Sequence, residues 1–211
     1  MVSTIKMDPH IYVVGDAENC HLGTGYFAVG DAQRWRLCII NKHTGSVARE
    51  FEVSGPGGAC PAVVVWTGKH YYLGSIGSRG EYRVYNTNGS FVKNWWASGW
   101  PSDMETTGAA TFANRVLKKD GSYLVASQRD RAGTSCVINM ANGSLVTTWY
   151  EPRLELKSAT FGRSSRPAAY GDVYWVIQRN YLEYLAMEVD LGGDHPAVAP
   201  SSIGKIKAVY H

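Results

Sequence analysis

The sequence predicts an all-β fold built from about four similar repeats, and three observations lead to this prediction. A strand, a glycine turn and a second strand recur three times in closely similar form. An aromatic residue follows each turn glycine by six positions, and a strand that begins with tyrosine precedes it by 18 to 20 positions. Spacing this regular is typical of a repeat protein, in which each copy folds into the same unit.

The clearest copy of the hairpin covers residues 82–95, YRVYNTNGSFVKNW. Its Asn88-Gly89 pair accepts the positive φ angles of a two-residue hairpin turn, which the sequence therefore predicts here. The stretches RLCIINKHTGSVAREF (36–51) and SCVINMANGSLVTTW (135–149) align with it on the turn glycine. The three turn glycines and their aromatic residues are Gly45 with Phe51, Gly89 with Trp95, and Gly143 with Trp149.

A further strand with its own register precedes each hairpin. The four tyrosine-led strands are Tyr26–Val29, Tyr71–Gly74, Tyr123–Ala126 and Tyr174–Ile177. The last of them implies a fourth repeat, whose turn we expect at Leu191–Gly193 by the same spacing.

One more strand comes before each tyrosine-led strand, at less regular spacing. The four expected segments are Ile11–Val14, Ala62–Trp66, Ala110–Phe112 and Ala159–Phe161. In the fourth repeat, Pro196 and Pro200 interrupt the expected outer strand, because proline cannot donate a hydrogen bond to a sheet. The alternating stretch Ile203–Tyr210 is expected to supply that strand instead.

Units of four strands that recur every 44 to 54 residues are typical of a β-propeller. We therefore predict a small β-propeller, with one domain over residues 1–211. Its four blades are expected at about 8–54, 59–99, 106–151 and 156–211. Each blade is too small to bury both of its faces, so Phe51, Trp95 and Trp149 are expected to pack between blades.

One pattern begins with Gly-x-x-Tyr, continues through Arg-Val-Tyr-Asn and a glycine turn, and ends at an aromatic residue. This pattern resembles the NHL-type and YVTN-type propeller repeats. It is closest over residues 71–95 and next over 123–149. The resemblance implies the shape of a blade and no particular activity. NHL-type propellers usually have six blades, so the four repeats imply either a small closed ring or an open arc that partners complete.

Composition limits the class of protein. The chain has 211 residues, a net charge of +3 and a pI near 8.6, which is less basic than expected of a dedicated nucleic-acid binder. No run of 18 apolar residues is present, so no membrane contact is expected. The first residues do not resemble a signal peptide, so we expect a cytoplasmic or virion protein. The four cysteines, Cys20, Cys38, Cys60 and Cys136, are expected to be reduced thiols.

No catalytic constellation is evident in the sequence. Gly74-Ser75-Ile76-Gly77 is the nearest approach to a nucleophile motif, and it lies at a predicted strand end instead of a strand-to-helix turn. The six histidines do not show the spacing that is typical of metal ligands. The alternative is a metal site at a propeller axis, assembled from ligands of different blades. We therefore expect no enzyme activity, no metal and no cofactor.

Arginine recurs in one loop of every repeat. The residues are Arg34, Arg36, Arg79, Arg83, Arg129, Arg131 and Arg179. In a propeller these loops emerge on one face, which predicts a basic surface for an acidic protein, a carboxylated glycan or a nucleic-acid backbone. The resemblance to NHL-type repeats implies an alternative, in which Arg36 and Arg83, at the starts of strands, brace neighbouring blades.

An aromatic surface is the second candidate site. Trp95 and Trp96 are adjacent in a strand and must point to opposite faces, so one of the pair is expected to be exposed or covered by a partner. The residues expected to contact a partner are Trp96, Trp100 and Tyr150.

These observations favour a non-enzymatic interaction or assembly module. The expected partners are other protein subunits, in an oligomer or a larger complex, with nucleic acid bound only through non-specific backbone contacts. By analogy of architecture, a phage tail hub or nozzle is one such complex. Two alternatives stay open: a lectin-like propeller that binds carbohydrate, and a lyase or hydrolase with its site at the propeller axis.

Overall fold

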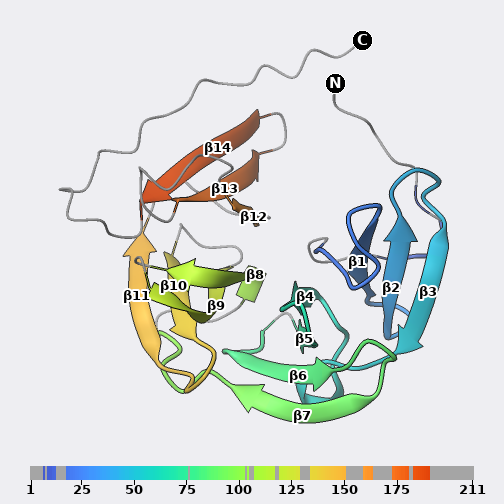
Figure 1. Cartoon of the computed structure of the whole chain (residues 1–211), viewed down its shortest axis with the longest axis horizontal. Coiled ribbons are helices and arrows are strands. Elements are labelled where there is room, and N and C mark those ends of the chain that lie inside the picture. The colour runs from blue at the N-terminus through green and yellow to red at the C-terminus, as the bar shows by residue number, and fades with distance from the viewer. Residues whose placement is uncertain are drawn as a thin grey trace. The chain divides into compact units, whose positions relative to one another are not determined.

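The computed structural model describes an all-β chain of antiparallel sheets (Figure 1). The described residues are 7, 9–12, 18–75, 77–102, 104, 107–116, 119–128, 134–150, 159–163, 173–180 and 183–190. Within these residues there are four sheets, and a single 3-10 turn is the only helical element. The chain divides into two compact units, residues 1–96 and 97–211, which are described separately. The prediction of a single domain stays a prediction.

The first unit contains two sheets. The first sheet has the order β1-β2-β3, with β1 at Tyr26–Asp31, β2 at Arg36–Asn41 and β3 at Val47–Glu52. The second has the order β4-β5-β6-β7, with β4 at Val63–Trp66, β5 at Tyr71–Gly74, β6 at Glu81–Tyr85 and β7 at Phe91–Trp96. The 3-10 turn η1 at Pro56–Gly58 lies on the segment that joins them.

The second unit also contains two sheets. The first has the order β8-β9-β10-β11, with β8 at Thr107–Val116, β9 at Lys119–Gln128, β10 at Thr134–Asn139 and β11 at Leu145–Tyr150. The second has the order β12-β13-β14, with β12 at Ala159–Arg163, β13 at Val173–Asn180 and β14 at Glu183–Asp190.

The strands confirm most of the sequence-based expectations. All four tyrosine-led segments are strands, in β1, β5, β9 and β13. Three of the four preceding segments are strands too, in β4, β8 and β12. The segment predicted at residues 11–14 is not confirmed, because Ile11 and Tyr12 lie outside any strand and residues 13 and 14 lie outside the described residues. The edge of β1 is instead met by Glu18, which exchanges backbone hydrogen bonds of 2.9 and 2.7 Å with Ala28.

The hairpin turns are longer than predicted. Five residues, 86–90, separate β6 from β7, so the prediction of a two-residue turn was wrong. The reason is Asn86, whose side-chain Oδ1 accepts the backbone N–H groups of Asn88 at 3.1 Å and Ser90 at 2.9 Å. Gly89 keeps the expected positive φ, at 83°. A side chain that caps its own turn in this way stabilises a wider loop than Asn-Gly alone requires.

The same turn occurs in the other two described hairpins. Asn41 Oδ1 accepts the N–H groups of His43 and Thr44, at 2.8 and 3.2 Å. Asn139 Oδ1 accepts the N–H group of Ala141 at 2.9 Å. The recurring element of the turn is therefore the asparagine that ends the first strand of each hairpin.

A β-bulge recurs in the outer strand of all three hairpins, three residues after the turn glycine. The pairing shifts by one residue at the same place each time, which leaves one extra residue in β3, β7 and β11. The extra residues are Ala48, Val92 and Val146. A bulge reverses which side chains face inward beyond it, so it sets the face to which the later aromatic residue points.

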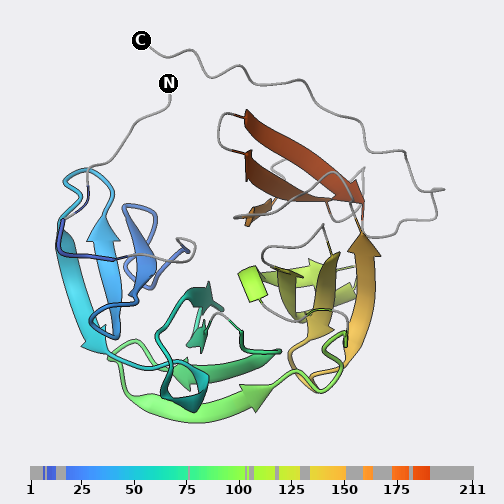
Figure 2. The ribbon, with the colours of Figure 1, turned by 180° about the vertical axis from the view of Figure 1, so that it is seen from behind.

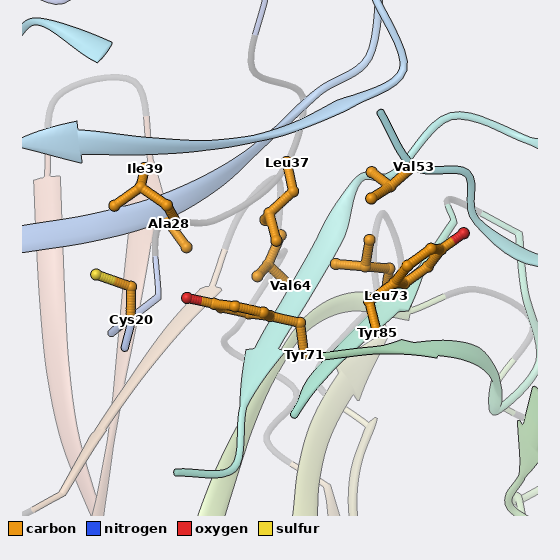
Figure 3. Close-up of a cluster of buried hydrophobic side chains, with 9 residues drawn as sticks. All are labelled: Cys20, Ala28, Leu37, Ile39, Val53, Val64, Tyr71, Leu73 and Tyr85. Carbon is orange, nitrogen blue, oxygen red and sulfur yellow. The ribbon is translucent and has the colours of Figure 1, made fainter. Parts of the chain in front are cut away.

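The core of the first unit lies between its two sheets (Figure 3). Its buried side chains are Cys20, Ala28, Leu37, Ile39, Val53, Val64, Tyr71, Leu73 and Tyr85. Seven of them come from β1 and β2 on one side and from β4, β5 and β6 on the other, whereas Cys20 precedes β1 and Val53 follows β3. Because neither sheet buries this face alone, the two sheets stabilise each other through removal of apolar surface from water.

Neighbouring sheets meet through equivalent strands in both units. The first strands β1 and β4 lie side by side in the first unit, and β8 and β12 do so in the second (Figures 1 and 2). At the outer edge of the first unit, Phe51 covers the turn of the next hairpin so closely that a Cβ on Gly89 would lie 2.7 Å from the Cβ of Phe51. The prediction that Phe51 packs against the next repeat is thus confirmed.

The other two aromatic residues of the repeat differ. Trp95 is buried, and its ring lies 5.7 Å from that of Tyr72 and 5.8 Å from that of Tyr82, both in its own sheet. Its role between blades stays a prediction, as does that of Trp149, whose side chain is outside the described part. The expected turn at 191–193 and the expected strand at 203–210 also lie outside the described residues.

Two further findings concern the described part of the chain. No disulfide is present among the described residues, and Cys20, Cys38 and Cys136 are buried. No helix in the described ranges is long and apolar enough to cross a membrane.

Candidate interaction surfaces

The predicted basic face is described in part. Arg34, in the loop between β1 and β2, and Arg79, between β5 and β6, are exposed. Arg129 and Arg131 lie outside the described residues, and Arg179 lies in β13, with its side chain outside the described part. A ring of positive charge that joins these loops stays a prediction.

Arg36 is engaged within its own sheet. Its guanidinium group forms an ion pair with the carboxylate of Glu50 on the adjacent strand β3. Both side chains are partly exposed, so solvent screens this ion pair and it contributes little to stability. This ion pair neutralises the positive charge of Arg36, so Arg36 contributes less charge to a basic face.

Arg83 braces the link between the two sheets of the first unit. Its guanidinium group donates a hydrogen bond to Ser54 Oγ and lies over the ring of Phe91, 5.3 Å from the ring centroid. Ser54 also donates its backbone N–H to the Tyr85 hydroxyl at 3.1 Å, and that hydroxyl donates to the Ser54 carbonyl oxygen at 3.0 Å. These contacts favour the bracing interpretation for Arg83.

Trp96 is more exposed than Trp100, the other predicted partner residue whose side chain is described. Trp95 is only 8% exposed, whereas Trp96 is 58% exposed at the end of β7. The prediction that one of the adjacent pair is exposed is therefore confirmed. β7 is the last strand in the order of its sheet, so Trp96 lies on an edge.

The other two predicted contact residues are placed differently. Trp100 belongs to the second unit and is half-buried, and its indole N–H donates to the carbonyl oxygen of Met104 at 2.9 Å. The ring is thus held against its own turn. Tyr150 ends β11, and its side chain is outside the described part.

His21 and Tyr71 form a polar contact that the sequence did not reveal. The Tyr71 hydroxyl accepts the backbone N–H of His21 at 3.1 Å and lies 2.7 Å from His21 Nδ1. The hydroxyl has one proton, and donation of it to Nδ1 places the imidazole proton on Nε2. Nε2 is buried and has no hydrogen-bond partner among the described residues. The rings of Phe51 and Trp66 lie 6.4 and 6.2 Å from the imidazole.

The environment keeps both groups neutral. Burial lowers the pKa of His21, and the positive charge of Arg49 lowers it further. Burial raises the pKa of Tyr71 to about 12. Two neutral groups that share a hydrogen bond between the sheets form a structural junction, and a proton on both imidazole nitrogens would disrupt it.

We expect the free energy of unfolding to fall as the pH drops through about 6.5, the ordinary pKa of histidine. Because the folded pKa of His21 is lower than this value, the unfolded chain binds more protons, so acid favours unfolding. His70, whose pKa burial also lowers, contributes with the same sign. Urea unfolding of His21→Gln between pH 5 and 8 should therefore show a flatter pH dependence than the wild type. The same change at the exposed His43 is the matched control, and a His21→Gln slope equal to that of the wild type would contradict this account.

The described residues give no support to the enzymatic alternative. No group of three or more His, Cys, Asp or Glu side chains in the described ranges is placed to hold a metal ion. Ser75, in the motif nearest to a nucleophile elbow, is buried in a turn after β5. Its Oγ has no hydrogen-bond partner among the described residues.

The structure thus defines an all-β repeat protein. No protein-family model matches the chain. No curated protein matches it either. Three solved structures are similar to it over most of its length. Kuenenia stuttgartiensis hydrazine synthase has a TM-score of 0.48 and 13% identity, and the match covers 83% of this chain and 50% of that chain. Chaetomium thermophilum Raptor has a TM-score of 0.48 and 14% identity, with 83% of this chain and 15% of that chain covered. Saccharomyces cerevisiae Sqt1 has a TM-score of 0.44 and 16% identity, with 74% of this chain and 39% of that chain covered. The chain spans half or less of each, and similarity at this level transfers no activity or partner.

Proposed function

We propose that this chain is a β-propeller-type module that binds other protein subunits and catalyses no reaction. In this proposal each sheet is one blade, and residues 203–210 complete the last blade. Three hairpins with the same capped turn and the same bulge support equivalent blades. Contacts between successive first strands in each unit support the stacking of blades around an axis.

A backbone contact in the second unit supports the same arrangement. The N–H of Gly99, just after β7, donates to the carbonyl oxygen of Gly143 at 2.8 Å. Gly143 is the turn glycine of the next hairpin, as Gly89 is for the contact with Phe51. Both turn glycines thus lie against another segment of their own unit, Gly89 against Phe51 of β3 and Gly143 against Gly99.

The observation that carries the interaction role is the exposure of Trp96 on an edge strand. Three large apolar side chains of β7, Phe91, Val92 and Trp96, are more than two-fifths exposed, and together we call them the β7 surface. Tryptophan contributes strongly to binding energy when a partner removes it from water. An exposed apolar edge is also a hazard for aggregation, which Lys93 in the same strand counters.

Replacement of Trp96 by Ser should weaken partner binding and leave the fold intact, because the ring contributes little to the core. A tagged wild-type chain should co-purify with a protein partner from a lysate of its source, or self-associate in light scattering. Trp96→Ser should lose at least about tenfold of that binding, which corresponds to roughly 1.4 kcal/mol. The matched control is Trp35→Gly, which removes another exposed tryptophan of the same unit and should bind the partner normally.

A strictly monomeric wild-type protein that captures nothing would count heavily against the proposal. If Trp96→Ser bound the partner as tightly as the wild type, the chain would still be an interaction module. The contact with the partner would then lie outside the β7 surface. The finer assignment to a phage tail hub or nozzle rests on analogy of architecture alone.

A further inference from the structure

We propose that the loop between β1 and β2, together with Tyr12, binds a saccharide that carries a carboxylate. The loop covers residues 32–35 and presents an amide, a guanidinium group and an indole ring to solvent. It is a different feature from the β7 surface, so this inference does not rest on the proposed function.

The loop is held at both ends. At its start, the fully buried Asp31 accepts the backbone N–H groups of Gln33 at 3.0 Å and Arg34 at 3.1 Å through Oδ1. At its end, the carbonyl oxygen of Trp35 accepts the N–H of Val53 at 2.9 Å. A loop fixed in this way has little conformational entropy to lose when a ligand binds.

Trp35 is strained and exposed at once. Its φ is 57°, and within the described ranges it is the single non-glycine residue with a positive φ. Bulky residues rarely adopt this conformation, because it brings the Cβ too close to the following carbonyl oxygen. The ring is 45% exposed, so burial in the core does not compensate for the strain. A strained residue that presents an aromatic ring to solvent is typical of a binding site.

A hollow adjoins the start of this loop. Tyr12 is 59% exposed, and its carbonyl oxygen accepts the N–H of Ala32 at 2.9 Å, which ties the preceding segment to the loop. Tyr12, Ala32 and Gln33 line a hollow of about 320 Å³. Ligand pockets run from about 300 to 1,000 Å³, so this one suits one or two sugar rings.

The side chains indicate the chemistry of the ligand. The apolar face of a sugar ring packs on an aromatic ring, and the Gln33 amide can bond sugar hydroxyls in both directions. Arg34 is exposed and can pair with a carboxylate, whereas Arg36 is already paired with Glu50. A nucleic acid would need a groove with several positive charges along its backbone, and this loop offers a single uncommitted one.

An array of uronic-acid and sialic-acid oligosaccharides, printed beside their neutral counterparts, supplies the probe. The strongest carboxylated hit is then titrated by calorimetry against its neutral counterpart. We expect the wild type to bind the carboxylated saccharide at least about tenfold more tightly. In Arg34→Gln, the affinity for the carboxylated saccharide should fall to that for the neutral one.

Trp35→Gly separates binding from folding. Glycine accepts a positive φ, so the midpoint of urea unfolding should be equal to that of the wild type or higher. Saccharide affinity should nevertheless fall at least about tenfold, while Trp96→Ser binds the saccharide as the wild type does. Three outcomes would overturn the proposal: no saccharide on the array binds, Trp35→Gly binds as well as the wild type, or a single-stranded oligothymidylate binds more tightly than every saccharide.

Discussion

Replacement of Tyr71 by Ala is expected to lower the free energy of unfolding by about 3–5 kcal/mol, the usual cost of removal of a large buried aromatic ring. Tyr71 is fully buried in β5 at the centre of the core of the first unit (Figure 3). Its ring lies 4.5 Å from that of Trp66, and its hydroxyl bonds His21. Urea unfolding at neutral pH, followed by intrinsic fluorescence, measures the loss.

Tyr71→Phe isolates the contribution of the hydroxyl. This change leaves the His21 backbone N–H and imidazole nitrogen without their partner, which should cost about 1–3 kcal/mol. The control is Tyr72→Phe, at the adjacent half-buried tyrosine, which should stay within about 0.5 kcal/mol of the wild type. If Tyr71→Phe proved as stable as the wild type, the His21 junction would have no energetic role.

Replacement of Gly30 by Ala is the second large effect that we expect, at about 3 kcal/mol of destabilisation. A Cβ on Gly30 would lie 2.0 Å from the carbonyl oxygen of Pro61 and 2.8 Å from its carbonyl carbon. These are backbone atoms of the segment just before β4, so they cannot rotate away as a side chain would. The clash would therefore separate β1 from β4, the pair of first strands on which the stacking of the first unit depends.

Gly25→Ala is the matched control, five residues earlier in the same region. Nothing lies within 4 Å of a Cβ at Gly25, so the change should alter the free energy of unfolding by less than about 0.5 kcal/mol. Thermal unfolding of the two variants beside the wild type gives the comparison. A Gly30→Ala protein as stable as Gly25→Ala would show that the two sheets do not approach as closely as described.

The strands were predictable because their signal is local. Tyr26, Tyr71, Tyr123 and Tyr174 each begin an apolar stretch between turn residues, and each of those stretches is a strand. The bulges at Ala48, Val92 and Val146 were not predictable in the same way, because small and apolar residues there fit either a regular or a bulged pairing. The turn length was missed because Asn86 competes with Asn88-Gly89 for control of the loop.

The exposure of a candidate surface residue was predictable only where the alternation of side chains along a single strand determines it. Trp95 and Trp96 must point to opposite faces, so the exposure of one of them followed from the sequence. The contact of His21 with Tyr71 joins residues 50 positions apart and depends on how two sheets pack, which no local pattern encodes. The strain at Trp35 was equally hidden, because a tryptophan is among the residues least expected at positive φ.

The central claim is that equivalent sheets stack through their first strands, as β1 does with β4 and β8 with β12. An experimental structure of the full chain tests this most directly. The account predicts that β1 lies beside β4 in the first unit and that β8 lies beside β12 in the second. Sheets of the first unit that met through their outer strands β3 and β7 instead would contradict it.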